Sequence, residues 1–556
     1  MKLSVKPMNY TEVRESREKA PSGRVFLSGV MVLTLSTVLV KVIGLLYKIP
    51  MLRLLGSEGM GYFNAAYEWY ATLCVIATSG LPLAVSILIA QAQGRKSSIG
   101  HIERLSFRVF GLLGVVGTLF LLLGSTMIAR AIGSPDTKFA VAAVAPTMLF
   151  SCLSGAYRGY FQGHQNMIPT AVSQVIEAAG KLLLGLAFAL LAKQRGLNTA
   201  QIAAWAMLGL SVGVAVSLVY LVYKRKSCKK TSDPSFVTDE EQVTAPPRLL
   251  KQLLSIAVPV TISSSVMNVT RLFDMAMILR RLQYLGYDAA GANTLYGGYT
   301  TMAVPIFNLI PSLITSVSLA LVPTLTAAIK TGDSQTQKTS TGSAIRLTAL
   351  LSLPASFSVM IYSKSILSLL FGNDPEVVTA APLLSVLAIS IFFSGVITTT
   401  NAILQAYGHA RAPIVSMLVG SAVKLLAAYF LIGLPGIHIY GAPISTFLCD
   451  TVIVGLNFSM IAKHTDVLPS LRRALGRPLI IAFLAVSIPG GLYTALVLGG
   501  YSHVSLFFAA VPVTLAIYFI LCLRLGLVGD EELSMLPRGI SHRLARICKT
   551  GAKSKE

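Results

Sequence analysis

The sequence is poor in charge and in cysteine. Only 12% of its 556 residues are charged, whereas 54% are hydrophobic. The six cysteines show no paired spacing; they are Cys74, Cys152, Cys228, Cys449, Cys522 and Cys548. A disulfide framework and a metal site are therefore unexpected, and we expect no bound cofactor.

Sequence motifs of nucleotide hydrolysis, zinc proteases and thiol chemistry are also missing. There is no Walker A loop, no HExxH helix and no CxxC pair, and the seven histidines form no ligand cluster. The chain therefore carries no built-in ATPase. A membrane glycosyltransferase or polymerase should carry acidic groups in sizeable outer loops. The candidate acids there are isolated: Asp136, Asp288, Asp374 and Glu376. A membrane enzyme of envelope assembly is the weakest of the functions that we consider.

The chain is instead rich in long apolar runs, fourteen of which are long enough to cross a bilayer. A spanning helix needs about 20 mostly apolar residues, and only helices and closed barrels satisfy every backbone group in lipid. Runs such as 479–498 are too long for barrel strands. The spans are 28–50, 60–92, 105–129, 138–161, 169–192, 202–223, 253–279, 297–328, 343–363, 378–406, 412–433, 440–462, 478–498 and 503–523. The predicted fold class is an all-α polytopic membrane protein with fourteen transmembrane helices.

The formal net charge of +23 follows from membrane topology. With the N-terminus in the cytoplasm, 33 of the 46 Lys and Arg residues lie on the cytoplasmic side, 8 lie outside and 5 lie within spans. This bias obeys the positive-inside rule. The even number of spans returns the C-terminus to the cytoplasm. The basic ends are expected to contact anionic membrane lipids, and no nucleic-acid partner is expected. No cleavable signal peptide is evident, and we expect a monomer in the bacterial cytoplasmic membrane.

An internal repeat divides the chain into two lobes. Shifted by 243 residues, 162–183 aligns with 405–426 without a gap, and Lys181 aligns with Lys424. Because charges within spans are rare, this pairing of the fifth span in each half indicates a parallel six-plus-six duplication, as in many transporters. The predicted segments are a cytoplasmic tail (1–27), an N-lobe (28–223), a linker (224–252), a C-lobe (253–462), a cytoplasmic loop (463–477), a helix pair (478–523) and a basic tail (524–556).

Two spans stand out within this plan. The pair 478–523 lies outside the repeat and is free of charge between Arg477 and Arg524. It is either a lipid-facing annex or a groove for a long acyl or polyprenyl tail. Span eight contains three prolines, Pro305, Pro311 and Pro323, and is the best candidate for a broken helix.

Charges inside the spans are the candidate site residues, because each is costly unless it is paired or hydrated. Lys41 and Lys48 are seven apart on one face of span one, and Arg53 continues the series toward the outer mouth. The alternative for Lys48 is that it snorkels to the outer interface. Glu68 is expected near the outer end of span two, either lining a vestibule or at the interface.

The remaining intramembrane charges suggest pairs. Arg271 and Asp274 share a face of span seven and form either a local ion pair or an exchangeable one. Glu177 and Lys181, spaced i and i+4, are predicted to form a structural ion pair. Lys424 lacks such a partner on its own helix. It therefore needs water, an anionic substrate or a carboxylate from another helix.

For Lys424, Asp450 is a candidate carboxylate. Glu68, Asp274 and Asp450 are the candidates for ion coupling or gating, with Na⁺ or H⁺ as the coupling ion. The membrane potential is the alternative energy source. The cations Lys41, Lys48, Arg53, Arg271 and Lys424 are the candidates for substrate binding. A cationic cavity suits a phosphate or diphosphate and suits a cationic drug poorly.

Several short motifs resemble the polysaccharide-export branch of the MOP flippase superfamily, and within it the stage V sporulation protein B group, which is related to lipid II flippases. They are KVIGLLYKIPMLRLLG at 41–56, GMGYF at 59–63, SGLPLA at 79–84, GYFQG at 159–163, LYGG at 295–298 and Pro305. The resemblance implies two six-helix lobes, a helix pair that forms a lipid-tail groove, and basic roles for Lys41 and Arg53. The sequence departs from the lipid II flippases at Tyr47-Lys48, where they carry an Arg-Asp pair.

The leading hypothesis is a flippase that translocates an undecaprenyl-diphosphate-linked saccharide by alternating access. This substrate is either a lipid II-like peptidoglycan precursor or another polysaccharide precursor. The alternative is a cation-coupled multidrug antiporter of the MATE type, which usually has twelve spans and a cavity dominated by carboxylates.

Overall fold

The computed structural model describes residues 23–92, 96–231, 246–372, 374–409, 411–465 and 472–525, and these residues form helices and turns without strands. Most of the predicted N-terminal tail and basic C-terminal tail lie outside the described residues, as do the middle of the linker and part of the 463–477 loop. Among the described residues, twelve helical segments are long and apolar enough to span a membrane.

The first of these candidates accounts for two passes. Residues 36–91 comprise most of α2 (Gly23–Thr78) and α3 (Leu81–Gln91), and α2 reverses its direction at Gly56. The φ of Gly56 is 66°, a left-handed conformation that glycine adopts at little cost. A further pass is made by α9 (Ala289–Gly298), η1 (Tyr299–Ala303) and α10 (Val304–Lys330). With these two additions, the fourteen predicted passes are confirmed for the described residues.

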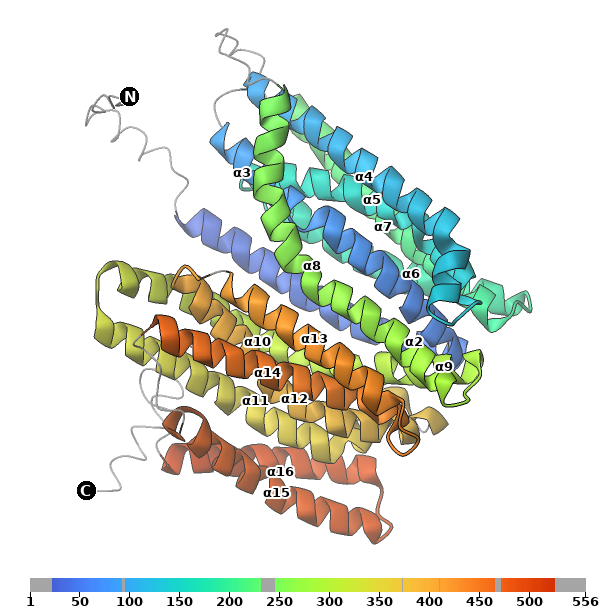
Figure 1. The fold of residues 1–556 in the computed structure, drawn as a ribbon, viewed down its shortest axis with the longest axis vertical. Helices are drawn as coiled ribbons and strands as arrows, with labels where there is room; N and C mark the ends of the chain where they lie inside the picture. Colours follow the sequence, from blue (N-terminus) through green and yellow to red (C-terminus); the bar gives the residue numbers. More distant parts are fainter. Residues whose placement is uncertain are drawn as a thin grey trace.

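The helices form two groups and a pair (Figure 1). The N-lobe consists of α2, α3, α4 (Lys96–Ala131), α5 (Thr137–Gly163), α6 (Ile168–Gln194) and α7 (Thr199–Thr231). The C-lobe consists of α8 (Pro246–Tyr284), α9, η1, α10, α11 (Ser334–Phe371), α12 (Pro375–Ala406), α13 (Ala412–Ile432), η2 (His438–Tyr440) and α14 (Gly441–His464). The pair is α15 (Arg477–Leu498), preceded by η3 (Arg472–Gly476), and α16 (His503–Arg524), and it packs on α11.

Small residues allow close packing within the N-lobe. On α6 and α7, Gly180 faces Gly213, and a Cβ built on Gly180 would lie 2.6 Å from the Cα of Gly213. Lipid tails are as apolar as leucine, so helices in a membrane associate through such close contacts rather than through the hydrophobic effect. Large apolar side chains point outward instead: Leu123 and Met127 are both 79% exposed. This pattern is that of a lipid-facing surface.

The two lobes meet tightly at one end, which we call the Gly56 end. There α2 packs against α9, and a Cβ on Gly61 would collide with the carbonyl of Asn293. Arg280 of α8 donates from Nε to the carbonyl of Ala131 at 2.6 Å, which ties the ends of α8 and α4 together. α8 crosses between the groups, contacting α3 of the N-lobe and α13 of the C-lobe (Figure 1). A space remains between the lobes in the middle of the bundle, lined by residues of both lobes.

Candidate functional site

A cavity of about 560 Å³ lies between the lobes and collects most of the intramembrane charges. Eight of the ten predicted site residues line it: Lys41, Lys48, Glu68, Lys181, Arg271, Asp274, Lys424 and Asp450. Five of these are cations and three are acids, so the walls carry a formal excess of two positive charges. Arg53 and Glu177 do not line this cavity.

Lys41 and Lys48 share one face of α2, and Gly44 lies between them on the cavity wall. This is the face that the seven-residue spacing predicts. The Nζ of Lys48 donates to the carbonyl oxygen of Thr300 at 2.8 Å, on η1 of the opposite lobe. Lys48 therefore does not snorkel to the interface; it ties the two lobes together inside the cavity.

The π-helical turn η1 explains why a backbone carbonyl is available to Lys48. The N–H of Val304 donates to the carbonyl of Tyr299, five residues back. If this pattern continued, the carbonyl of Thr300 would accept a hydrogen bond from the N–H of residue 305. Residue 305 is a proline, which has no N–H. The Thr300 carbonyl thus accepts a hydrogen bond from the Lys48 ammonium instead. The interruption expected in the proline-rich span eight lies at this turn, and π-turns are frequent at functional sites.

Lys181 of α6 is held by aromatic rings. Its Nζ lies 5.1 Å, 5.6 Å and 4.2 Å from the ring centroids of Tyr47, Phe63 and Tyr67, all on α2. Ring faces are electron-rich and attract a cation, by about 0.5–2 kcal/mol each depending on desolvation. We call these three rings the aromatic cage.

The predicted ion pair between Glu177 and Lys181 is wrong. The Oε2 of Glu177 instead contacts the Nη2 of Arg158 on α5 at 2.8 Å, and the Nε of Arg158 donates to the Oγ of Ser173 at 3.0 Å. A guanidinium on a neighbouring helix offers a planar set of donors that satisfies both partners on α6. Lys181, one turn farther along α6, contacts the aromatic cage and lines the cavity instead.

In the C-lobe, Lys424 of α13 forms an ion pair with Asp274 of α8, with Nζ and Oδ2 2.8 Å apart. Two expectations are corrected by this contact. Asp274 does not pair locally with Arg271, and Asp450 is not the partner of Lys424. The Oδ2 of Asp450 accepts a hydrogen bond from the Oγ of Ser394 at 2.8 Å. The short link from Asp274 to a facing helix replaces the weaker pairing along one helix surface.

Two further residues differ from their expected positions. Glu68 lines the central cavity, so the interfacial alternative is wrong. Arg53 is exposed and lies outside the cavity, near Gly372. Five residues along an α-helix correspond to a rotation of about 140°, which turns Arg53 away from the face that carries Lys48.

Comparison with known proteins agrees with this architecture. Residues 26–329, more than half of the chain, match the family described as polysaccharide biosynthesis protein. The chain belongs to the polysaccharide biosynthesis protein family. A second family, MatE, matches residues 296–430 of this family member.

Relatives of this polysaccharide biosynthesis family protein are found in Bacillus subtilis (strain 168). Stage V sporulation protein B is 26% identical, over 92% of this chain and 98% of the relative. The lipid II flippase MurJ is 28% identical, over 79% of this chain and 82% of the relative. An uncharacterized membrane protein, YabM, is 28% identical over 92% of this chain and 94% of the relative. Of these three relatives, MurJ is the one whose name states a transport function, that of a lipid II flippase.

Solved structures share the fold of this family member. The lipid II flippase MurJ in an inward closed conformation superposes with a TM-score of 0.67, at 13% identity, over 88% of this chain and 97% of that structure. An inward-facing multidrug resistance MATE family transporter of the MOP superfamily has a TM-score of 0.57, at 14% identity, over 76% and 98%. The chain is therefore a multi-pass membrane protein with the fold that these two transporters share.

The cavity of this polysaccharide biosynthesis family protein is suited to anions. Within the described residues, only Lys424 among its five cations has a carboxylate within ion-pair distance. Lys41, Lys48, Lys181 and Arg271 therefore leave positive charge available to a ligand. Low water content around such groups strengthens their attraction for phosphate.

Neutral residues of the site escaped the sequence-based interpretation. Asn64 donates from Nδ2 to the hydroxyls of Thr300 and Thr301, at 3.0 Å and 2.8 Å, beside the Lys48 contact. An amide inside an apolar run was the available signal, because a buried amide needs partners. The aromatic cage gave no signal, since aromatic residues in a span are ordinarily core residues.

Proposed function

We propose that this protein is a flippase that translocates an undecaprenyl-diphosphate-linked saccharide across the bacterial cytoplasmic membrane by alternating access. The observation that carries the proposal is the cavity wall formed by Lys41, Lys48 and Lys181. Its three ammonium groups face one space, and no carboxylate of the described residues lies within ion-pair distance of them. A diphosphate supplies the missing negative charge. An uncharged or cationic substrate would leave these groups unpaired.

The contact between Lys48 and Thr300 gives substrate binding a route to conformational change. Lys48 joins α2 to η1 across the lobes. A phosphate oxygen is a stronger acceptor for an ammonium than a neutral carbonyl. Substrate that takes over the Lys48 ammonium therefore breaks a contact specific to the present arrangement. A ligand shifts a conformational equilibrium only through such a difference in binding between two states.

The helix pair α15–α16 is the proposed place of the polyprenyl tail. Its outward side chains are apolar: Phe508 is 61% exposed and Leu515 is 59% exposed. The lipid tail then stays in the hydrocarbon while the diphosphate and saccharide pass between the lobes. The asymmetry of Lys and Arg further supports cytoplasmic termini, which makes the Gly56 end the outer end.

The energy source belongs to the same proposal. Moving one elementary charge through the membrane potential is worth about 2.3 kcal/mol per 100 mV. The membrane potential can therefore drive the positively charged cavity back to its starting arrangement after the anionic substrate leaves. Glu68 and Asp450, which have no ion-pair partner among the described residues, are the proposed carriers of a coupling Na⁺ or H⁺.

The decisive experiment measures flipping of fluorescent undecaprenyl-diphosphate saccharides in proteoliposomes. Wild type is compared with Lys41→Ala, Lys48→Met and Lys181→Met. Lys330→Met is the matched control, because Lys330 is exposed at the end of α10 outside the cavity. Loss of one charge-assisted contact is expected to slow flipping about tenfold or more, and the control should flip at the wild-type rate.

The MatE match over residues 296–430 keeps a cation-coupled drug antiporter as the second candidate. Its test uses the same proteoliposomes loaded with a cationic dye under a Na⁺ or H⁺ gradient. Dye export that requires Glu68 or Asp450, without lipid flipping, would favour the antiporter. Equal lipid flipping in wild type and the three lysine variants would contradict the proposal that the diphosphate binds at this cavity wall.

A further inference from the structure

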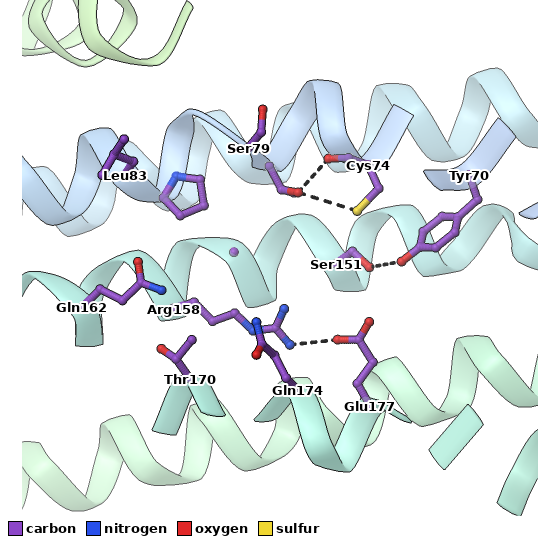
Figure 2. A pocket seen from close by; sticks show the side chains of 13 residues that line it. Tyr70, Cys74, Ser79, Leu83, Ser151, Arg158, Gln162, Thr170, Gln174 and Glu177 are labelled. Carbon is purple, nitrogen blue, oxygen red and sulfur yellow. Dashed lines mark hydrogen bonds and ion pairs between the residues drawn. The ribbon is translucent and has the colours of Figure 1, made fainter. Parts of the chain in front are cut away.

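A second cavity, of about 280 Å³, lies inside the N-lobe and shares no lining residue with the central one (Figure 2). Its walls come from the junction of α2 and α3, from α5 and from α6. Its volume is enough for one small polar ring.

The walls of this cavity carry polar groups without protein partners. The hydroxyl of Thr170 has no hydrogen-bond partner although the residue is only 1% exposed. The Ser79 hydroxyl is likewise buried and unpartnered. The half-buried side-chain amides of Gln162 and Gln174 line the same cavity. Buried polar groups are ordinarily satisfied by protein or by water, so the unpartnered hydroxyls and the two amides are available to a polar ligand.

The electrostatics of this cavity differ from those of the central cavity. Its guanidinium, Arg158, is neutralised by Glu177, with Nη2 and Oε2 2.8 Å apart (Figure 2). The walls therefore have no excess charge. They offer two amides, a carboxylate and several hydroxyls, which donate and accept in comparable numbers. Such a set matches a neutral ring that bears hydroxyl groups and does not match a phosphate.

The second cavity adjoins the cationic wall. Tyr67 lines the central cavity and Tyr70 lines the second one, and their ring centroids are 5.9 Å apart. Along α6, Gln174 of the second cavity precedes Lys181 of the central cavity by seven residues. That corresponds to about 10 Å along the helix axis. A diphosphate at Lys181 thus places a directly attached sugar near the second cavity.

We infer that the second cavity is a sugar subsite, which binds the first pyranose ring of the lipid-linked saccharide while the central cavity binds its diphosphate. The inference rests on the proposed function and adds to it a separate place for the saccharide. Gln174 and Gln162 bind ring hydroxyls through their amides, and Thr170 supplies its unpaired hydroxyl. The subsite selects substrates that carry a sugar over the bare lipid diphosphate.

The test compares two probes on purified full-length protein in nanodiscs: undecaprenyl diphosphate and undecaprenyl-diphosphate-N-acetylhexosamine. Binding is titrated for wild type, Gln174→Leu and Thr170→Val. Gln194→Leu is the matched control, because Gln194 is an exposed glutamine at the far end of the same helix. Thr170→Val removes a hydroxyl that has no protein partner, so the fold should be unaffected or slightly more stable.

Wild type is expected to bind the sugar-bearing lipid more tightly than the bare diphosphate. Each of the two variants should lose about three- to tenfold in affinity for the sugar-bearing lipid and keep wild-type affinity for the bare diphosphate. An unchanged preference in both variants would overturn the subsite while leaving the flippase proposal intact. Failure of folded wild type to bind either lipid would overturn the flippase proposal, and the subsite with it.

Discussion

Lys424 on α13 and Asp274 on α8 form an ion pair at 2.8 Å, whereas Lys181, the repeat counterpart of Lys424, rests on aromatic rings. The side chains of Lys424 and Asp274 are each 13% exposed. The two lobes thus present matched lysines in different ways. The C-lobe lysine is neutralised by a carboxylate, and the N-lobe lysine keeps its charge for a ligand. This asymmetry makes one wall of the cavity the anion-binding wall.

Breaking the Lys424–Asp274 pair on one side should be more harmful than removing both partners. Asp274→Leu leaves an unpaired ammonium and Lys424→Met an unpaired carboxylate. Each is expected to lower the free energy of unfolding by about 3 kcal/mol, the low end for a broken buried pair, because the cavity admits water. The double variant should recover most of this loss, as measured by thermal unfolding in detergent. Additive losses in the double variant would show that the pair does not stabilise the fold.

The sequence identified the charged residues of the cavity better than it identified their partners. Lys41, Lys48 and Lys181 stood out because a charge in an apolar run is expensive, and that argument needs no coordinates. Pairing within one helix was the only geometry available from spacing, and it misassigned Glu177. Contacts such as Glu177 to Arg158 depend on how helices face one another across the lobe. Span number followed from hydropathy, but the π-helical turn before Pro305 required the structure.

Pro305→Ala is predicted to weaken the contact between the lobes at Lys48. The new N–H at position 305 competes with the Lys48 ammonium for the carbonyl of Thr300. The present arrangement of the lobes should then be less populated. Spin labels at cysteines introduced at His164 and His409, on turns of the two lobes, report the separation of the lobes.

In this experiment a second distance population should grow in Pro305→Ala, and also in Lys48→Met, relative to the labelled wild type. Pro311→Ala, about 1.7 turns farther along α10, serves as the control and should keep the wild-type distribution. A shift in Lys48→Met without one in Pro305→Ala would show that an N–H at position 305 does not compete with Lys48 for the carbonyl of Thr300.

The aromatic cage predicts a measurable coupling between Tyr67 and Lys181. Tyr67→Phe keeps the ring face beneath the ammonium and should leave the free energy of unfolding near that of wild type. Tyr67→Leu removes the ring and should lower it. A double-mutant cycle with Lys181→Met isolates the part that depends on the ammonium, which we expect to be about 0.5–2 kcal/mol. If Tyr67→Leu costs the same in the Lys181→Met background, the ring acts only through packing.

Gly61 on α2 is predicted to control closure of the Gly56 end. A Cβ at this position would meet the backbone carbonyl of Asn293 on α9, which cannot rotate away as a side chain can. Gly61→Ala should therefore fold, since it raises helix propensity by up to about 1 kcal/mol, yet disfavour the arrangement in which α2 and α9 touch. Gly111→Ala is the matched control, because no atom lies within 4 Å of a Cβ built there.

In proteoliposomes, Gly61→Ala is expected to flip lipid at least tenfold more slowly than wild type, while Gly111→Ala flips at the wild-type rate. Alternating access requires each end of the bundle to close in turn, so a variant that cannot close one end completes no cycle. A cysteine introduced at Ser57, 1% exposed in the present structure, should become accessible to a water-soluble thiol reagent in Gly61→Ala. Wild-type flipping together with a protected Ser57 cysteine would show that the backbones of α2 and α9 separate without opening this end.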